Sequence, residues 1–121
     1  MIPKKTLVLG ASLNPDRYSN LVLFRLSSKE IDVVAFGLKS GIVSGINIDT
    51  DLKVYQGVHT VTLYLNPKRQ EAYYDYVISL KPVRVIFNPG TENSIFYNLL
   101  KEASIAYEVA CSLVLLSTNQ Y

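Results

Sequence analysis

A short apolar run that leads into a turn of small residues constrains the fold of this chain more than any other segment. Leu7, Val8 and Leu9 are consecutive apolar residues, which is typical of a strand covered on both faces in a parallel sheet. The Gly-Ala-Ser turn at 10–12 would bring the backbone close to a ligand above the carboxyl end of that strand, and Ser19 is the expected N-cap of the following helix. Because free N–H groups and the positive end of a helix dipole converge at such a turn, it favours a bound phosphate over a purely structural turn.

Strand-like apolar segments alternate with helical patterns along the rest of the chain, as they do in βαβ units. Asn66 is expected to cap a second helix with Pro67 at its first position, and Thr91 to cap a third. The glycine-containing stretch 38–56 is expected to be a long connection with one short extended piece around Ile46. Strands are expected at 7–9, 31–36, 58–65, 83–87 and 105–110.

These elements predict an α/β fold, a doubly wound five-stranded parallel sheet in the order 3-2-1-4-5 with helices on both faces. Ligands of such sheets bind at the carboxyl ends of the strands, where the order of the strands reverses. In the predicted order this point lies between the first and fourth strands. The turn at 10–19 would then face Asn88 to Thr91.

Composition limits the class of protein. A chain of 121 residues with 49% hydrophobic and 18% charged residues is expected to form one domain, 1–121, and not to be disordered. The net charge of +2 is spread along the chain, so nucleic acid is not expected as the main partner. The single cysteine, the lack of an apolar signal-peptide core and the lack of a long apolar run predict a cytoplasmic protein outside the membrane.

Catalytic chemistry finds little support in the sequence. One histidine, His59, and one cysteine, Cys111, cannot build a zinc cluster. No acid, base and nucleophile converge, so we expect no catalytic residue. Tyr73, Tyr74 and Tyr76 form an aromatic stripe on the second helix, which predicts core packing or an interface that could support a homodimer.

The first loop differs from a dinucleotide fingerprint in two ways. The fingerprint needs three glycines at set spacing, and only Gly10 is present. No acid follows the second strand to bind a ribose diol, and Lys39, found there instead, suits a phosphate better. Arg17 and Lys39 are predicted to lie at the same rim. Lys68 and Arg69, two cations in the first turn of a helix, are interpreted as a weak surface effect rather than as a sign of a nearby anion.

Taken in order, these motifs resemble the CoA-binding domain family, small Rossmann-like proteins similar to the CoA-binding domain of the succinyl-CoA synthetase alpha subunit. The resemblance covers residues 5–113. It depends on the motifs Gly10-Ala11-Ser12, Asn14-Pro15, Arg17-Tyr18-Ser19, Lys39 with Gly41, Asn88-Pro89-Gly90, Glu92-Asn93, and Cys111.

The resemblance implies binding of coenzyme A (CoA) or an acyl-CoA as a small-molecule nucleotide ligand, with no reaction attached. By the same resemblance, Lys39 would pair with one phosphate, Leu65, Asn66 and Pro67 would flank the adenine, and Asn88, Pro89 and Gly90 would line the path of the pantetheine arm. The residues that would cradle the phosphates are Gly10, Ala11, Ser12, Asn14, Arg17, Tyr18 and Ser19.

The chain departs from the family pattern at three pairs of positions. Tyr64-Leu65 stands where the family often has Phe-Arg, Val109-Ala110 where it often has Asp-Arg, and Gly37-Leu38 where it usually has Asn-Pro. The alternatives to a CoA-binding protein are a redox protein that holds a dinucleotide and a ligand-free protein-interaction domain.

Overall fold

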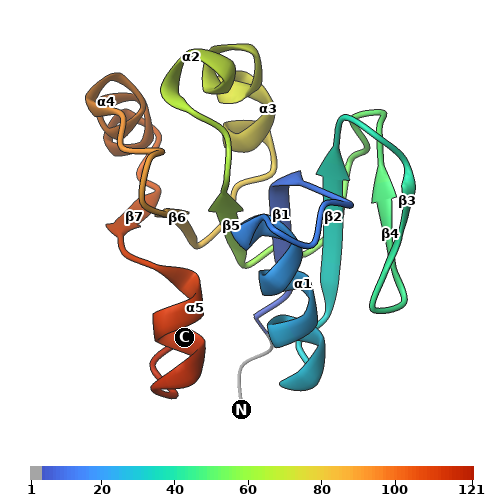
Figure 1. The fold of residues 1–121 in the computed structure, drawn as a ribbon. Coiled ribbons are helices and arrows are strands. Elements are labelled where there is room, and N and C mark those ends of the chain that lie inside the picture. The colour runs from blue at the N-terminus through green and yellow to red at the C-terminus, as the bar shows by residue number, and fades with distance from the viewer. Residues whose placement is uncertain (1–3) are drawn as a thin grey trace.

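A seven-stranded sheet with its first strand near the middle organises the fold. The computed structural model describes residues 4–121, and in it β1 (Thr6–Ala11) pairs in parallel with β2 (Val33–Gly37) on one side and β5 (Thr60–Leu63) on the other. Outside β5 lie β6 (Arg84–Phe87) and β7 (Ala106–Val109), both parallel to their neighbours. The full order is β3-β4-β2-β1-β5-β6-β7 (Figure 1).

The predicted five-stranded sheet with the order 3-2-1-4-5 is therefore wrong. The segment between the second and third expected strands forms a hairpin of β3 (Gly41–Val43) and β4 (Ile46–Asp49), and the extended piece expected around Ile46 is β4. β4 pairs in parallel with the outer edge of β2. Because that edge is already occupied, the next strand, β5, pairs with the free edge of β1. The five expected strands consequently follow the order 2-1-3-4-5, and the reversal lies between β1 and β5.

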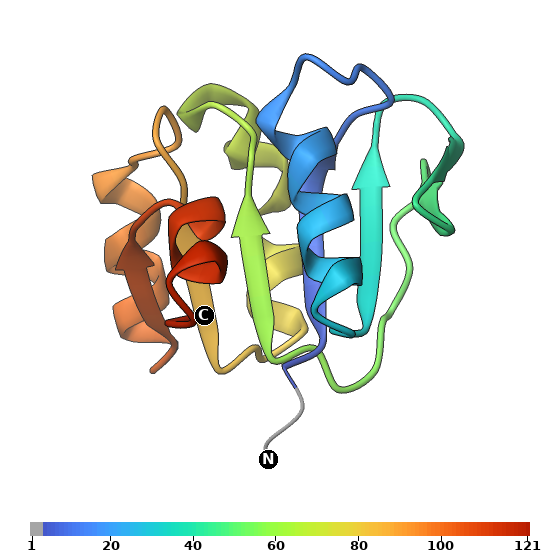
Figure 2. The same cartoon turned by 60° about the horizontal axis from the view of Figure 1, so that its bottom comes forward.

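Helices cover both faces of the sheet, as predicted. On one face, α1 (Tyr18–Ser28) and α5 (Ser112–Ser117) pack together; on the other lie α2 (Pro67–Gln70), the 3-10 turn η1 (Glu71–Tyr73), α3 (Tyr74–Ser79) and α4 (Ser94–Glu102) (Figures 1 and 2). Each face has its own apolar core, and successive residues of β1 alternate between the two.

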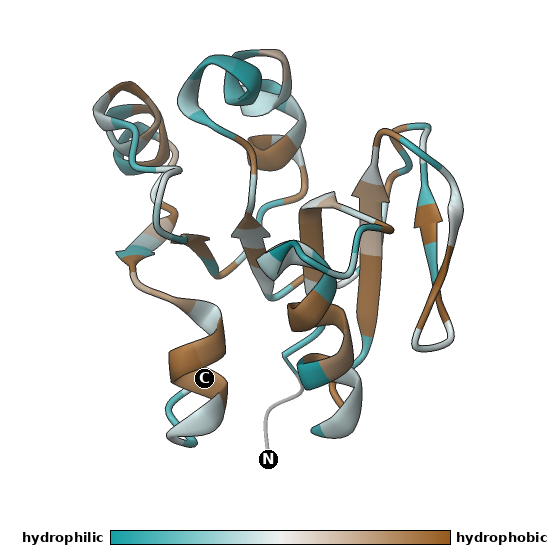
Figure 3. Cartoon of the chain, viewed as in Figure 1, coloured by the Kyte–Doolittle hydropathy of each residue, from teal (hydrophilic) through white to brown (hydrophobic). Residues whose placement is uncertain are grey.

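Apolar residues are concentrated on the strands and on the helix faces turned toward them (Figure 3). The core beneath α3 and α4 is rich in aromatic rings, with Phe87 and Phe96 fully buried and in edge-to-face contact at 5.6 Å between ring centroids. The three tyrosines of the predicted stripe are half-buried and pack against this core. None of the helices within residues 4–121 is long and apolar enough to span a bilayer.

Two of the three predicted helix caps lie elsewhere. Asn66 caps α2 as expected, since its Oδ1 accepts a hydrogen bond from Arg69 N at 2.9 Å. α1 begins at Tyr18, which puts Ser19 inside its first turn rather than at the cap. α4 is capped by Asn93, whose Oδ1 accepts from Phe96 N, because the Thr91 hydroxyl instead donates to the carbonyl of Asn88.

Candidate functional site

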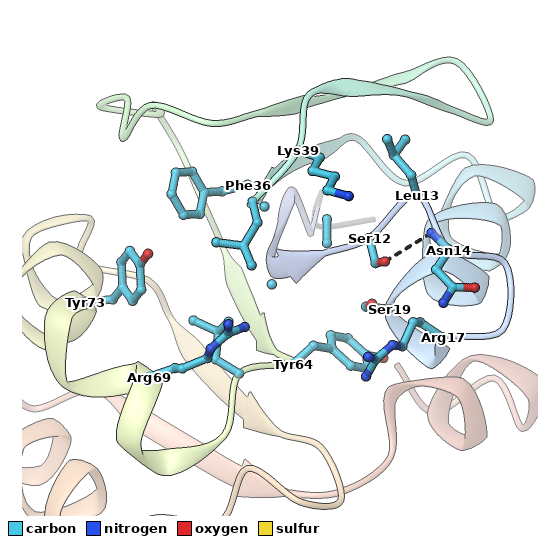
Figure 4. Close-up of a pocket in the computed structure, with 15 residues that line it drawn as sticks. Ser12, Leu13, Asn14, Arg17, Ser19, Phe36, Lys39, Tyr64, Arg69 and Tyr73 are labelled. Carbon is cyan, nitrogen blue, oxygen red and sulfur yellow. Dashed lines mark hydrogen bonds between the residues drawn. The ribbon is translucent and has the colours of Figure 1, made fainter.

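The carboxyl ends of β1, β2 and β5 form the floor of a hollow of about 320 Å³ (Figure 4). It lies at the point where the strand order reverses, which is where ligands bind in open α/β sheets. Its walls come from the loops after β1, β2 and β5 and from α2 and η1. The residues that line it are Gly10, Ala11, Ser12, Leu13, Asn14, Arg17, Ser19, Phe36, Gly37, Leu38, Lys39, Tyr64, Leu65, Arg69 and Tyr73.

Two glycines allow the backbone to pack closely under this hollow. Gly10 has a φ of +101°, and a Cβ added there would lie 3.0 Å from Leu65 Cδ2 and 3.1 Å from the carbonyl carbon of Tyr64. A Cβ on Gly37 would lie 2.2 Å from the carbonyl oxygen of Ala11. The ends of β1, β2 and β5 can therefore meet only where these side chains are absent.

The loop between β1 and α1 is held by its own polar groups. Ser12 Oγ accepts from Asn14 N at 3.1 Å, and Asn14 Oδ1 accepts from Asp16 N at 3.0 Å. From α1, the buried Asn20 amide donates to the carbonyl of Ser12 at 2.9 Å. Arg17, the N-cap residue of α1, makes no side-chain cap hydrogen bond, so the N–H groups of Tyr18 and Ser19 remain available to an anion or to water, whereas that of Asn20 donates to the carbonyl of Arg17 at 3.0 Å.

Three cations, Arg17, Lys39 and Arg69, line the hollow from three different segments of the chain. Arg17 and Arg69 lie on the two sides of Tyr64, and Lys39 lies at the β2 side (Figure 4). The predicted shared rim of Arg17 and Lys39 is thus confirmed. Arg69, expected as a surface charge, also lines this hollow. The sequence signal that marks it is its unfavourable place in the first turn of α2, where a cation opposes the helix dipole.

A second hollow of about 240 Å³ adjoins the first and shares Arg17, Tyr64, Leu65 and Arg69 with it. Its other wall is the loop between β6 and α4. Among the described residues that line the two hollows, none is an aspartate or a glutamate. The residues that line the second hollow are Arg17, Tyr64, Leu65, Asn66, Arg69, Pro89, Gly90 and Thr91.

Three of the predicted site residues line neither hollow. Tyr18 is 73% exposed and Pro67 starts α2 at the surface. Asn88 is 2% exposed, and its amide donates to Thr62 Oγ1 at 2.7 Å and to the carbonyl of Leu63 at 2.8 Å. Its Oδ1 accepts from Ser112 N at 2.8 Å. Asn88 therefore joins β5, β6 and α5.

The expected meeting of the first loop with residues 88–91 is found only in part, because Arg17 is the one described residue of that loop that lines a hollow together with residues 89–91. Since β5 lies between β1 and β6, the loop after β5 separates the two segments. Only Pro89, Gly90 and Thr91 reach the second hollow, opposite Arg17.

Aromatic side chains and leucines form the apolar part of the first hollow. Phe36 and Tyr73 are in edge-to-face contact, with 5.6 Å between ring centroids. Burial raises the pKa of Tyr64 well above its ordinary value, so this phenol stays protonated at neutral pH and offers no base. His59 and Cys111 line neither hollow, and His59 lies just before β5 at the amino end of the sheet.

Residues 4–117 match the model of a protein family that is described as CoA binding domain. The chain belongs to the CoA binding domain family. The match covers the loops after β1, β2, β5 and β6, and so all the residues of both hollows. None of the curated proteins matches the chain.

Three solved structures that are similar to this chain have names that state no activity. A crystal structure of an uncharacterized protein has 45% sequence identity and a TM-score of 0.95, with 100% of both chains covered. A hypothetical protein from Pyrococcus horikoshii OT3 has 27% identity and a TM-score of 0.80 over 90% of this chain and 77% of that one. Cell-free ID.343 from Thermus thermophilus, with 23% identity and a TM-score of 0.86 over 98% and 91% of the two chains, shows the fold alone.

Proposed function

We propose that this protein binds coenzyme A or an acyl-CoA in the two adjoining hollows and carries out no reaction on it. The observation that carries the proposal is the set of three cations, Arg17, Lys39 and Arg69, around a hollow in a chain of the CoA binding domain family. CoA carries a diphosphate and a separate phosphate on its ribose. Charge-assisted hydrogen bonds from Arg and Lys are the strongest that proteins offer to such groups.

The nucleotide belongs in the first hollow. The loop that follows β1 and the first turn of α1 supply N–H groups to the diphosphate, with Arg17 beside them. Lys39, after β2, stands where dinucleotide enzymes place the group that recognises the ribose, and it suits a ribose phosphate. Phe36, Tyr73 and Leu65 offer apolar surface to the adenine.

Arg69 replaces a cation that the family pattern places elsewhere. The family often has Phe-Arg where this chain has Tyr64 and Leu65. Arg69 lies four residues after Leu65 and lines both hollows. It therefore supplies a positive charge at the boundary between them. We expect it to contact the diphosphate from the side opposite Arg17.

The lack of carboxylates in the hollows makes other nucleotides poorer ligands. NAD binding in doubly wound sheets uses an acid on the ribose diol, and nucleotide–Mg²⁺ complexes are usually held through carboxylates. Neither kind of group lines the described hollows. The same lack, with a protonated Tyr64, leaves no general base beside the ligand, which is why we propose binding without reaction.

Thermal unfolding with CoA, acetyl-CoA, NAD, NADP and ATP tests the proposal. A ligand at about 100 times its Kd stabilises the fold by about 2.7 kcal/mol, which for this size of chain raises Tm by about 10 °C. We expect this shift with CoA and acetyl-CoA, and a smaller one or none with NAD and ATP. A flat response to CoA would contradict the proposal and favour the protein-interaction alternative, whereas a response to NAD alone would favour the redox alternative.

A matched pair of variants in α2 then tests the site. Arg69→Ala removes a cation from both hollows, whereas Lys68→Ala removes the neighbouring exposed cation, which lines neither. Hydrogen bonds to charged groups contribute about 1.5–3 kcal/mol, so Arg69→Ala should weaken CoA binding about 10- to 100-fold in calorimetric titration. Equal effects of the two substitutions would show that Arg69 acts only through the overall charge.

A further inference from the structure

Gln70 is a deeply buried polar side chain next to the two hollows, and it lines neither of them. It is 1% exposed, at the end of α2, and directly follows Arg69. Its Nε2 donates to the carbonyl of Leu65 at 2.8 Å and to the carbonyl of Thr91 at 2.8 Å. Leu65 and Thr91 both line the second hollow, one from the loop after β5 and the other from the loop after β6. One side-chain amide therefore joins the two walls of that hollow.

The orientation of this amide is fixed by a third contact. Gln70 Oε1 accepts from Asn93 Nδ2 at 2.9 Å, and the same Nδ2 donates to the Tyr74 hydroxyl at 2.9 Å. A flipped Gln70 amide would set its NH₂ against the NH₂ of Asn93 and its oxygen against two carbonyls. Since Asn93 also caps α4, the network links α2, α3 and α4 to the two loops.

The first hollow is held by a separate amide on the other face of the sheet. Asn20 of α1 donates to the carbonyl of Ser12 and has no hydrogen bond to the network of Gln70. The loop after β1, on the nucleotide side, and the two loops that Gln70 joins thus have separate supports.

We propose that Gln70 is a positioning residue that sets the width of the second hollow and thereby the affinity for the part of the ligand that extends past the nucleotide. This inference rests on the proposed function, because it assigns the second hollow to the arm of CoA beyond the diphosphate. Gln70 acts only through Leu65 and Thr91. Its loss leaves two carbonyls without a donor, so the two loops separate or take up water between them.

The test compares CoA with adenosine 3′,5′-bisphosphate, which carries the nucleotide part without the arm. Gln70→Met keeps much of the side-chain length and removes every hydrogen bond, and Gln70→Leu removes them with a shorter apolar side chain. Either variant should lose about tenfold in CoA affinity while its affinity for the bisphosphate stays within about twofold. The matched control, Asn20→Leu, should weaken both ligands by the same factor, because it loosens only the nucleotide side.

Amide hydrogen exchange without any ligand separates this inference from the proposed function. In the Gln70 variants, the amides of residues 88–93 should exchange faster, with those of residues 10–19 unchanged; Asn20→Leu should give the reverse. An equal loss of both ligands, no loss of either, or faster exchange spread over the whole chain would overturn the role of Gln70. If the wild-type protein bound neither ligand, the proposed function would fail, and the exchange pattern would still decide whether Gln70 holds the two loops.

Discussion

Replacing Gly10 by alanine tests how closely the backbone must pack beneath the site. Gly10 lies at a φ of +101°, a conformation that L residues rarely adopt. The added Cβ would also lie 3.0 Å from Leu65 Cδ2 and 3.1 Å from the carbonyl carbon of Tyr64. The Leu65 side chain can turn away, whereas the Tyr64 backbone is fixed by the hydrogen bond from its N–H to the carbonyl of Leu9. The substitution therefore combines backbone strain with a contact that only a backbone shift can relieve.

The size of the effect follows from these two terms. Backbone strain at such a φ costs about 1–3 kcal/mol, and overpacking of a close contact costs about 1–3 kcal/mol more. The smaller entropy of the unfolded alanine chain offsets about 0.4–1 kcal/mol of this. We expect Gly10→Ala to lower the free energy of unfolding by about 3 kcal/mol, and Tm by about 10 °C.

Gly90 provides the control. Its φ of +92° is close to that of Gly10, and no atom lies within 4 Å of the place its Cβ would take. Gly90→Ala should therefore show the effect of backbone strain alone. In urea unfolding, its free energy of unfolding should be about 1–2 kcal/mol higher than that of Gly10→Ala. Equal losses in the two variants would refute the claim that the loop after β5 packs against Gly10, since the contact would then add nothing to the strain.

Three further predictions concern the frame around the site. Asn88→Ala removes three buried hydrogen bonds, among them the one from Ser112 N, and should lower the free energy of unfolding by about 2–4 kcal/mol in urea titrations. Phe96→Ala empties a fully buried ring site and should cost about 3–5 kcal/mol, measured in the same way. Burial, and next to it the charge of Arg84, lowers the pKa of His59; the unfolded chain then takes up the proton first, so stability should fall as the pH drops below about 6.5. His59→Gln should make the difference between pH 5 and pH 8 smaller, and an unchanged difference would contradict the assignment.

The strands could be predicted from the sequence because both faces of the sheet are covered. Segments such as 83–87 are short, apolar and bounded by turn residues, which is the pattern of a strand without exposed faces. Their order could not be predicted in the same way. The order depends on whether residues 38–56 fold back on β2. The two strands of that hairpin have only three and four residues, so they leave a weak hydrophobic pattern among glycines and polar residues.

For a related reason, only some residues of the candidate site can be predicted from the sequence. The sheet fixes the position of residues that closely follow a strand, such as Ser12 and Lys39, because the carboxyl ends of parallel strands lie at one edge. Arg69 follows a helix cap instead, and whether it faces the sheet or the solvent depends on how α2 packs. Asn88 follows a strand too, but the packing of α5 against β5 and β6 turns it into a buried bridge to Ser112.

The charges around the hollows support the proposed function independently of the family match. The ion pairs found among residues 4–121 are Lys53–Asp49 and Arg84–Glu108, and both lie away from the hollows. Arg17, Lys39 and Arg69 thus face one space without a carboxylate, and the dipole of α1 adds positive potential there. Repulsion between like charges that converge in this way lowers the stability of the ligand-free fold. A multiply charged anion removes that repulsion, and a CoA-sized phosphate ester is the ligand that both the charges and the apolar wall of Phe36 and Tyr73 would accommodate together.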